Sequence, residues 1–326
     1  MRAVVVKEFG PIDSHKLAET PDPIPGPGEV LLDVHAIGVN FPDSLMVQGL
    51  YQIKPDRPFT PGRDAAGVVT AVGDGVTSVK PGDRITTLYT FGAYAEQRVV
   101  PEERCFPLPD DIDFVTAAGM TTVYLTAWVA FMERGQYQPG EKVLVLGASG
   151  GVGLACVQIA KAHGATVIGG DIDEEKRAIA LANGADAVCG TMGDDFSDTM
   201  RKEVFAATDG YGVDIALDPI GGDVFAAAIR TLAFGGRIVC IGFVAGIPTA
   251  KAGYFNVKNL SMVGMALDLH FRHKPQVIKA AAADVFDLYT KGKIKPQITV
   301  TYPLEDAITA LSQFGQQKSI GKMVMT

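Results

Sequence analysis

A glycine-rich turn is the segment of this chain whose residue types and spacing most directly indicate chemistry. It reads Gly147-Ala148-Ser149-Gly150-Gly151-Val152-Gly153 and lies between the apolar run Val143–Leu146 and a helical pattern that ends near His163. Glycines let the backbone approach a phosphate closely, and the first N–H groups of the following helix point toward it. An ordinary tight turn can carry the same glycines, but the flanking strand and helix patterns favour a dinucleotide site. The residues that we expect to bind its pyrophosphate are Gly147, Ser149, Gly150, Gly151, Val152 and Gly153.

A carboxylate after the next strand bears on which dinucleotide binds. Asp171 lies 18 residues after Gly153, close to the spacing of about 20 at which an acidic residue accepts hydrogen bonds from the ribose hydroxyls. Since a carboxylate would repel the 2′-phosphate of NADP, Asp171 indicates an NAD(P)H site that favours NADH without excluding NADPH. Alternatively, Asp171 only caps the helix that begins near Glu174, while Lys176 or Arg177 reaches a phosphate.

The elements around the turn alternate between strand and helix. From Lys142 to Leu267, short apolar runs that suit buried strands are followed by helical patterns, which predicts a doubly wound parallel sheet. The strands that we expect are Val143–Leu146, Thr166–Ile168, Asp186–Cys189, Val213–Leu217, Arg237–Ile241 and Leu260–Leu267. Ligands collect at the carboxyl ends of such strands. We therefore expect the main chain of Gly242, Phe243 and Val244, just past one of them, to meet the carboxamide end of the cofactor.

The first part of the chain follows a different pattern. Fourteen of the nineteen prolines precede residue 141, and glycine and proline cut this part into short apolar segments such as Val30–Ala36 and Ala66–Val72. Frequent turns between short strands predict an antiparallel, barrel-like domain. The last segment is too short for a third domain, so we assign it back to the first. The expected division is residues 1–123 and 268–326 for the catalytic domain and 124–267 for the nucleotide-binding domain.

Composition argues against several classes of partner. The formal charge is −8, without a long basic run, so nucleic acid is not an expected partner. No unbroken apolar run reaches the roughly 18–20 residues of a membrane-spanning helix. The four cysteines, Cys105, Cys156, Cys189 and Cys240, are widely separated, which argues against a disulfide framework or structural zinc. We expect a cytoplasmic protein that does not bind membranes.

Several motifs in one order resemble the medium-chain dehydrogenase/reductase superfamily, in particular its zinc-independent quinone oxidoreductase branch, which includes zeta-crystallin. Besides the glycine turn, the segments that carry the resemblance are Gly38–Asp43, Gly49–Tyr51, Pro61–Val69, Val79–Arg84, Gly92–Glu96 and Leu125–Ala127. The resemblance implies an α/β fold in which a GroES-like β-barrel domain is joined to a Rossmann domain. It also implies a cofactor cleft between the domains and a homodimer joined through the Rossmann sheets.

The resemblance also indicates that zinc is absent. Zinc-dependent members of the superfamily have a cysteine at the position of Asn40 and a histidine at that of Arg63, with a third cysteine position near Ala118. A catalytic zinc needs about three Cys, His or carboxylate ligands, and asparagine and arginine are neither. His270 and His273 stand three residues apart, but next to Arg272 and Lys274 they are more typical of a solvated basic loop. We expect no bound metal.

Candidate catalytic residues follow from the same resemblance. Hydride transfer needs a donor to the oxygen that gains charge. At positions that line the active site in quinone oxidoreductases, Asn40 offers an amide N–H and Tyr51 a phenol, although a turn asparagine and a surface aromatic are their ordinary alternatives. Asp43 is expected to orient the loop or pair with Arg63 rather than carry a proton.

Three further residues match family positions. Thr126, and less clearly Thr122, fall where relatives contact the nicotinamide. Lys322 belongs to a Gly321-Lys322 pair that is typical of the family's C-terminus and is a candidate cofactor residue, with a purely structural contribution as the alternative.

The expected reaction is hydride transfer from NAD(P)H to a quinone or an α,β-unsaturated carbonyl. One alternative is an enoyl-CoA or acryloyl-CoA reductase, in which Arg272-His273-Lys274 would meet the CoA phosphates. Another is a crystallin-like protein that binds the cofactor with little turnover. The partners expected in each case are the cofactor, a small-molecule substrate and a second copy of the chain.

Overall fold

The protein divides into two compact units of different architecture. The structure, a computed structural model, describes residues 1–316 and 320–326. Met1–Thr122 and Pro296–Thr326 form one unit, and Val123–Lys295 form the other. The first is the expected GroES-like domain and the second the expected Rossmann domain, so the predicted α/β fold class is confirmed. We refer to them as the GroES-like unit and the Rossmann unit.

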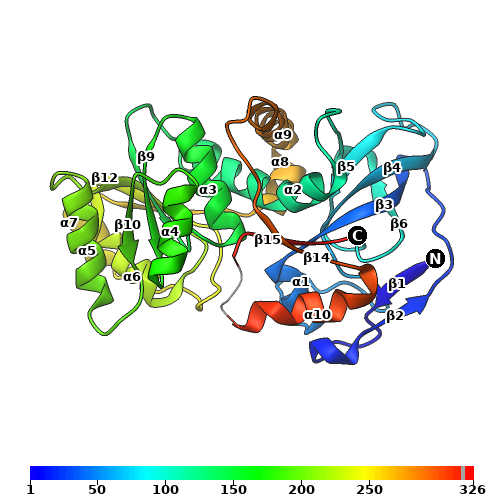
Figure 1. The fold of residues 1–326 in the computed structure, drawn as a ribbon, viewed down its shortest axis with the longest axis horizontal. Helices are drawn as coiled ribbons and strands as arrows, with labels where there is room; N and C mark the ends of the chain where they lie inside the picture. The colour runs from blue at the N-terminus through cyan, green and yellow to red at the C-terminus, as the bar shows by residue number, and fades with distance from the viewer. Residues whose placement is uncertain (317–319) are drawn as a thin grey trace. The chain divides into compact units, whose positions relative to one another are not determined.

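A six-stranded parallel sheet forms the centre of the Rossmann unit (Figure 1). Its strand order is β10-β9-β8-β11-β12-β13. The bounds are β8 (Lys142–Leu146), β9 (Thr166–Asp171), β10 (Ala187–Gly190), β11 (Val213–Asp218), β12 (Leu232–Cys240) and β13 (Ser261–Gly264). The order reverses between β8 and β11, and ligands bind at such a switch point in doubly wound folds. The expected strands are therefore present, with β12 beginning five residues earlier than Arg237.

Helices connect these strands, and the first four lie where the sequence predicts helices, whereas the fifth was not predicted. They are α3 (Gly151–Ala162), α4 (Glu174–Ala182), α5 (Phe196–Ala207), α6 (Gly222–Ile229) and α7 (Ala252–Lys258). The N-cap of α4 is Asp173, whose side chain accepts a hydrogen bond from the Lys176 backbone N–H at 2.8 Å. Capping of this helix by Asp171, the alternative raised above, is thereby excluded.

The expected boundary at residue 268 is wrong. Helices α8 (Leu267–His273) and α9 (Pro275–Thr290) belong to the Rossmann unit, which extends to Lys295. The Asp284 carboxylate of α9 accepts hydrogen bonds from Trp128 Nε1 at 2.7 Å and from His163 Nε2 at 2.9 Å. These contacts hold α9 within the Rossmann unit, and they join side chains too far apart in the chain to be paired from their spacing.

A seven-stranded sheet in the GroES-like unit brings the C-terminal segment to the N-terminal part of the chain. Its order is β14-β15-β3-β4-β5-β7, with β6 also paired to β3. The bounds are β3 (Glu29–Val39), β4 (Asp64–Val72), β5 (Arg84–Leu88), β6 (Gln97–Pro101), β7 (Cys105–Pro107), β14 (Ile298–Tyr302) and β15 (Lys322–Met325). Met323 pairs with Val39 in antiparallel register, so the return of residues 296–326 to this unit is confirmed.

Shorter elements complete this unit. They are the paired strands β1 (Arg2–Val5) and β2 (Lys16–Glu19), the helices α1 (Phe41–Val47) and α10 (Ala307–Ser312), and single 3-10 turns at Ile12–Ser14, Glu102–Arg104, Leu304–Asp306 and Gln313–Gln316. Helix α10, red in Figure 1, packs beside α1. Before β6, Ala95 forms an isolated antiparallel bridge with Ala3.

One helix is long and apolar enough to span a membrane, although the sequence contains no unbroken apolar run of that length. Helix α2 (Phe114–Trp128) continues into a π-helix, Val129–Arg134. This 21-residue segment is long and apolar enough to cross a membrane by length and composition, and 78% of its apolar window is buried inside the protein, as in a core helix. Threonines interrupt its apolar run in the sequence, but a helix can satisfy their hydroxyls, as Thr121 Oγ1 donates to Ala117 O at 2.7 Å.

Candidate active site

The glycine turn has the geometry of a phosphate cradle. Gly147 has a φ of +59°, and a Cβ added to Gly153 would lie 1.9 Å from Gly147 O. The N-cap of α3 is Gly150, which has no side chain to cover the first-turn N–H groups of Gly151, Val152 and Gly153. These donors remain available, with the positive end of a 12-residue helix behind them;. The site therefore fits a dinucleotide pyrophosphate.

Asp171 supports this turn from within. Its Oδ2 accepts a hydrogen bond from Ser149 N at 2.8 Å and its Oδ1 one from Ile172 N at 2.8 Å, and the residue is 4% exposed. The Asp171 carboxylate, which was predicted to select the cofactor, thus holds the glycine turn in place. Its role toward the ribose stays a prediction. Lys176 and Arg177 lie half-buried in the first turn of α4.

Asp218, which the sequence reasoning missed, lies at the switch point at the end of β11. Its Oδ1 accepts hydrogen bonds from Ile220 N at 2.8 Å and Gly221 N at 2.9 Å, and its buried Oδ2 has no partner in the described chain. Burial raises its pKa to about 6. The signal that could have revealed it is Asp218-Pro219-Ile220-Gly221-Gly222, a second glycine-containing turn after a buried strand.

The loops after β8, β11 and β12 meet at the same edge of the Rossmann sheet. Gly242 N donates to Asp218 O at 3.3 Å and Ala245 N to Ile220 O at 2.8 Å, while a Cβ on Gly147 would lie 2.6 Å from Ile220 Cδ1. The side chains of Phe243 and Val244 are exposed. The structure therefore brings the predicted Gly242-Phe243-Val244 segment to the same edge as the glycine turn.

In the GroES-like unit, Asn40 is not free to act as the predicted donor. Its Nδ2 donates to Asp64 Oδ1 at 2.6 Å and to Gly38 O at 3.2 Å, so both amide hydrogens are engaged. Its Oδ1 accepts a hydrogen bond from Lys322 Nζ at 2.5 Å. The expectation that Asn40 offers an amide N–H to the substrate is corrected, because Gly38 O and the Asp64 carboxylate already accept both of its hydrogens.

Lys322 lies inside the GroES-like unit instead of projecting toward solvent as a cofactor contact. It is 5% exposed, and its Nζ also donates to Val39 O at 2.8 Å. Burial lowers the pKa of its ammonium, while the nearby Asp64 and Asp43 carboxylates act in the opposite direction. This placement favours the structural alternative for Lys322 over direct binding of the cofactor.

Asp43 holds the loop that contains Asn40. Its Oδ2 accepts hydrogen bonds from Asn40 N at 3.0 Å and from the Tyr94 hydroxyl at 3.1 Å, forming part of the capping box of α1. Burial, followed by the charge of Asp64, raises its pKa to about 6, while Arg63 and Lys322 lower it. The residue is completely buried, so it orients the loop and is not placed to exchange a proton with substrate.

Tyr51 keeps its hydroxyl available. The ring is half-buried against the apolar core of the GroES-like unit. Within residues 1–316 and 320–326 its hydroxyl has no hydrogen-bond partner. Of the two predicted donors, only Tyr51 can therefore bond to a substrate oxygen without first losing another contact. Thr126 and Thr122 are both largely buried on α2.

The positions of the family's zinc ligands do not fit a metal here. Asn40 and Arg63 offer an amide and a guanidinium, neither of which is a usual zinc ligand. In the described part of the chain, no group of three or more His, Cys, Asp or Glu side chains could hold a metal ion. The basic residues Arg272 and His273 lie in helix α8 and not in the expected loop, and Lys274 directly after them forms an ion pair with Glu133. His270 of the same helix bonds to Ala266 O.

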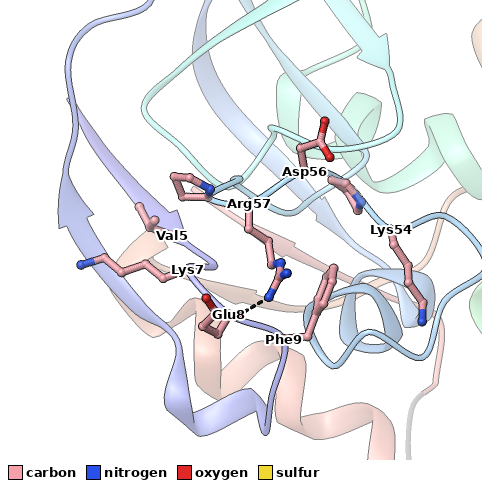
Figure 2. A pocket seen from close by; sticks show the side chains of 9 residues that line it. Val5, Lys7, Glu8, Phe9, Lys54, Asp56 and Arg57 are labelled. Atoms are coloured by element: carbon pink, nitrogen blue, oxygen red, sulfur yellow. Dashed lines mark hydrogen bonds and ion pairs between the residues drawn. The ribbon is translucent and has the colours of Figure 1, made fainter.

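A separate cavity of about 910 Å³ opens in the GroES-like unit. Its lining includes Lys7, Lys54 and Arg57 but none of the residues predicted for catalysis or cofactor binding. The Arg57 guanidinium is paired with Glu8 and lies 4.8 Å from the centre of the Phe9 ring. Figure 2 shows Lys7 and Lys54 extending in different directions. The charged groups thus do not converge on one bound group.

Comparison with known families agrees with the two units. Residues 26–110 match the family described as "Alcohol dehydrogenase GroES-like domain", and residues 151–283 match "Zinc-binding dehydrogenase". The second name refers to zinc, but the side chains of Asn40 and Arg63 supply no ligand for it. The match to residue 283 also includes α8 and most of α9.

Full-length relatives are found among curated proteins and solved structures. The chain is 35% identical to rat quinone oxidoreductase over 328 residues, which covers 100% of this chain and 97% of the relative. It is similar to a mycobacterial protein solved with NADPH (TM-score 0.92, 31% identity, 100% and 99% covered). It is also similar to Escherichia coli quinone oxidoreductase solved with NADPH (TM-score 0.91, 29% identity, 100% and 99% covered).

Proposed function

Because the chain belongs to the quinone oxidoreductase-like branch of the medium-chain dehydrogenase/reductase superfamily, we propose that it reduces a quinone or another α,β-unsaturated carbonyl with NAD(P)H and without zinc. The observation that carries this proposal is the free hydroxyl of Tyr51 in a chain that also has an open glycine cradle. The glycine cradle can bind the pyrophosphate of a nicotinamide cofactor, and the free hydroxyl can donate a hydrogen bond to the substrate oxygen that gains charge.

The roles of the chain's own residues follow from their contacts. Bound NAD(P)H supplies the hydride, and the protein supplies position and polarisation. The N–H groups of Gly151, Val152 and Gly153 bind the pyrophosphate. Tyr51 donates its hydroxyl hydrogen to the carbonyl oxygen, which gains negative charge as hydride adds to the conjugated system. Addition of one hydride to a quinone gives the hydroquinone monoanion, which takes one proton from water to become the hydroquinone, so no radical intermediate is required.

A substrate panel tests the proposal. Steady-state rates are measured with 1,4-benzoquinone, 9,10-phenanthrenequinone, an alkyl enone and crotonyl-CoA, each with NADH and NADPH. Turnover of the quinones or the enone supports the proposal, whereas turnover of crotonyl-CoA alone supports the enoyl-CoA alternative. Cofactor binding without turnover of any acceptor would identify the crystallin-like alternative.

A tyrosine substitution tests the donor. Tyr51→Phe keeps the ring and removes the hydroxyl, so kcat should fall about 10- to 100-fold, since a lost oxyanion donor commonly costs that much or more. Tyr302→Phe, at the end of β14, is a matched control that should retain full kcat. An unchanged kcat in Tyr51→Phe would remove this residue from the mechanism.

The preference between cofactors is a separate proposal. We propose that the Asp171 charge favours NADH, although two structural relatives were solved with NADPH. Asp171→Asn removes the charge and keeps an oxygen that can accept from Ser149 N. It should raise kcat/KM for NADPH relative to NADH. If wild type prefers NADPH and Asp171→Asn leaves the ratio unchanged, the carboxylate serves only the turn.

We further propose a cytoplasmic homodimer joined through the Rossmann unit. Strand β13 lies at the edge of its sheet and exposes Met262, and the segment before it also exposes apolar side chains at Ile247 and, in α7, at Tyr254 and Val257. An unpaired apolar edge is suited to pairing with a second copy. Light scattering should give twice the 34.4 kDa chain mass, and Val257→Lys/Met262→Lys should give the monomer.

The four cysteines are free, as expected in the cytoplasm, and fractionation of cells would test that location.

A further inference from the structure

Four residues from separate elements of the GroES-like unit form one buried chain of hydrogen bonds. Lys322 Nζ of β15 donates to Asn40 Oδ1, at the N-cap of α1, at 2.5 Å. Asn40 Nδ2 donates to Asp64 Oδ1 of β4 at 2.6 Å. Asp64 Oδ2 in turn accepts a hydrogen bond from the Thr122 backbone N–H of α2 at 3.1 Å. All four residues are at least nine-tenths buried.

The two charged ends of this chain decide which way the Asn40 amide faces. An ammonium can only donate and a carboxylate can only accept hydrogen bonds. If the amide were turned over, its NH₂ would meet the Lys322 ammonium and its oxygen would meet Asp64. Both contacts would then be repulsive, so Lys322 and Asp64 together permit one orientation.

The same chain fixes part of α2. Thr122 lies within the helix, yet its N–H is directed to the Asp64 carboxylate. One turn earlier, Ala118 O lies so close to β3 that a Cβ on Gly38 would approach it to 2.4 Å. The helix is thus held against the sheet by a carboxylate and by a glycine that allows close approach.

We infer that Lys322 is a positioning residue, whose ammonium orients the Asn40 amide and, through Asp64, holds the backbone of α2 at Thr122. The inference deepens the proposed function and rests on it for its catalytic consequence, because Thr122 is a position predicted to contact the nicotinamide. Lys322 then affects the reaction without touching the cofactor or the substrate.

The charges around the chain make the ammonium hard to replace. Asp43 and Asp64 are completely buried, and the other buried cations near them are Arg63 and Arg98. Arg98 donates to Arg63 O, Thr87 Oγ1 and Phe91 O and not to a carboxylate. Lys322 is the charged group that donates to the side-chain oxygen of Asn40, and its ammonium also donates to Val39 O.

The first test measures amide hydrogen exchange in the α2 peptide around residues 117–126. Lys322→Met keeps the apolar stem and removes the ammonium, and we expect exchange in this peptide to speed up by about tenfold or more, because the Thr122 contact is loosened. Lys80→Met, an exposed lysine of the same unit, is the control and should exchange like wild type. Unchanged exchange in Lys322→Met, or an equal change in the control, overturns the inference.

The second test separates positioning from cofactor contact and from stability. Lys322→Met/Asp64→Asn removes both charges and should recover most of the thermal stability while kcat/KM for the acceptor stays about 10- to 100-fold low, as expected for a misplaced site. The Kd for NADPH, from its fluorescence, should remain within about twofold of wild type. A matching loss of NADPH affinity would instead make Lys322 a cofactor ligand, and full recovery of kcat/KM would leave it a purely structural role.

These tests remain informative if the proposed function fails. A wild-type protein that reduces none of the acceptors contradicts the proposed function, whereas hydrogen exchange in α2 still reports on the Lys322 chain. Lys322→Arg adds a check of the charge. It retains a cation and should slow exchange in α2 relative to Lys322→Met, and exchange as fast as in Lys322→Met would contradict the inference.

Discussion

The two units stabilise their buried carboxylates in different ways. In the GroES-like unit, Asp64 accepts a hydrogen bond from the Asn40 side chain, which in turn bonds to Lys322. In the Rossmann unit, the hydrogen bonds that Asp171 and Asp218 accept in the described part of the chain come from backbone N–H groups in the turns that they support. One unit therefore depends on the identity of distant side chains, and the other depends on the path of nearby loops.

This difference predicts where each unit is sensitive to substitution. Removing one side-chain partner from a buried cluster leaves a charge without compensation, which is among the costliest changes to a protein core. A backbone N–H remains when its residue is changed to any amino acid except proline, so the Rossmann carboxylates should instead respond to changes that alter the turn. Four experiments would break or sharpen the comparison.

The largest effect is expected from Lys322→Met. The free energy of unfolding should fall by about 3–5 kcal/mol, because the buried hydrogen-bond chain of Asn40 and Asp64 loses the ammonium at its end. Urea denaturation of Lys322→Met, beside the exposed control Lys80→Met, measures the difference. A loss below about 1 kcal/mol would mean that the cluster does not depend on this cation and would remove the contrast between the units.

A glycine pair tests the Rossmann turn. In Gly153→Ala the new Cβ would lie 1.9 Å from Gly147 O, whereas in Gly150→Ala it would lie 3.4 Å away. Alanine normally favours a helix over glycine, but the clash at Gly153 should reverse the sign and destabilise the protein by about 1–3 kcal/mol. Equal thermal stability of the two variants would show that the turn adapts to a Cβ.

The smallest expected effect is on the pH dependence of stability. The pKa values of Asp43 and Asp218 are raised from 3.8 to about 6, so the folded state binds their protons more tightly than the unfolded state does. Their contribution to stability is therefore present at low pH and is lost as pH rises toward 6, by about 1.4 kcal/mol per pH unit for each group. Asp43→Asn and Asp218→Asn should each flatten this slope in denaturation curves.

The pH dependence of Lys322→Met stability then distinguishes the two units. The Lys322 charge lowers the pKa of Asp43 but is not among the causes of the Asp218 shift. Lys322→Met should therefore extend the Asp43 part of the slope to higher pH and leave the Asp218 part unchanged. A shift of both parts would show that the two carboxylates are coupled.

The sequence predicted best what depends on neighbouring residues. The glycine turn and the strands and helices around it follow from local patterns, because a phosphate cradle is built from one continuous segment. Asp171 was recognised by its spacing from the turn, but its contact with Ser149 N was not, since the direction of a side chain depends on packing. The 21-residue apolar helix formed by α2 and the following π-helix was not predicted, because threonines interrupt its run of apolar residues in the sequence.

For the candidate site of the GroES-like unit, the sequence predicted the residues but not their roles. Asn40, Asp43 and Lys322 were all selected, yet the structure makes them one buried network and leaves Tyr51 as the available donor. The domain boundary at 268 was wrong for the same kind of reason. The contacts of Asp284 with Trp128 and His163 join residues 156 and 121 positions apart.

The sequence by itself determined that this chain folds as a barrel-like unit and a doubly wound unit with a dinucleotide turn, because periodicity and glycine spacing act over a few residues. The resemblance of its motifs to a known superfamily identified these units as GroES-like and Rossmann domains. Only the tertiary structure decided that Asn40 is already bonded and that Lys322 is a buried cation. Lys322 and Asn40 are 282 positions apart, and their contact exists only because β15 pairs with β3. Which hydrogen of a side chain is free is a property of the folded surroundings and not of the residue type.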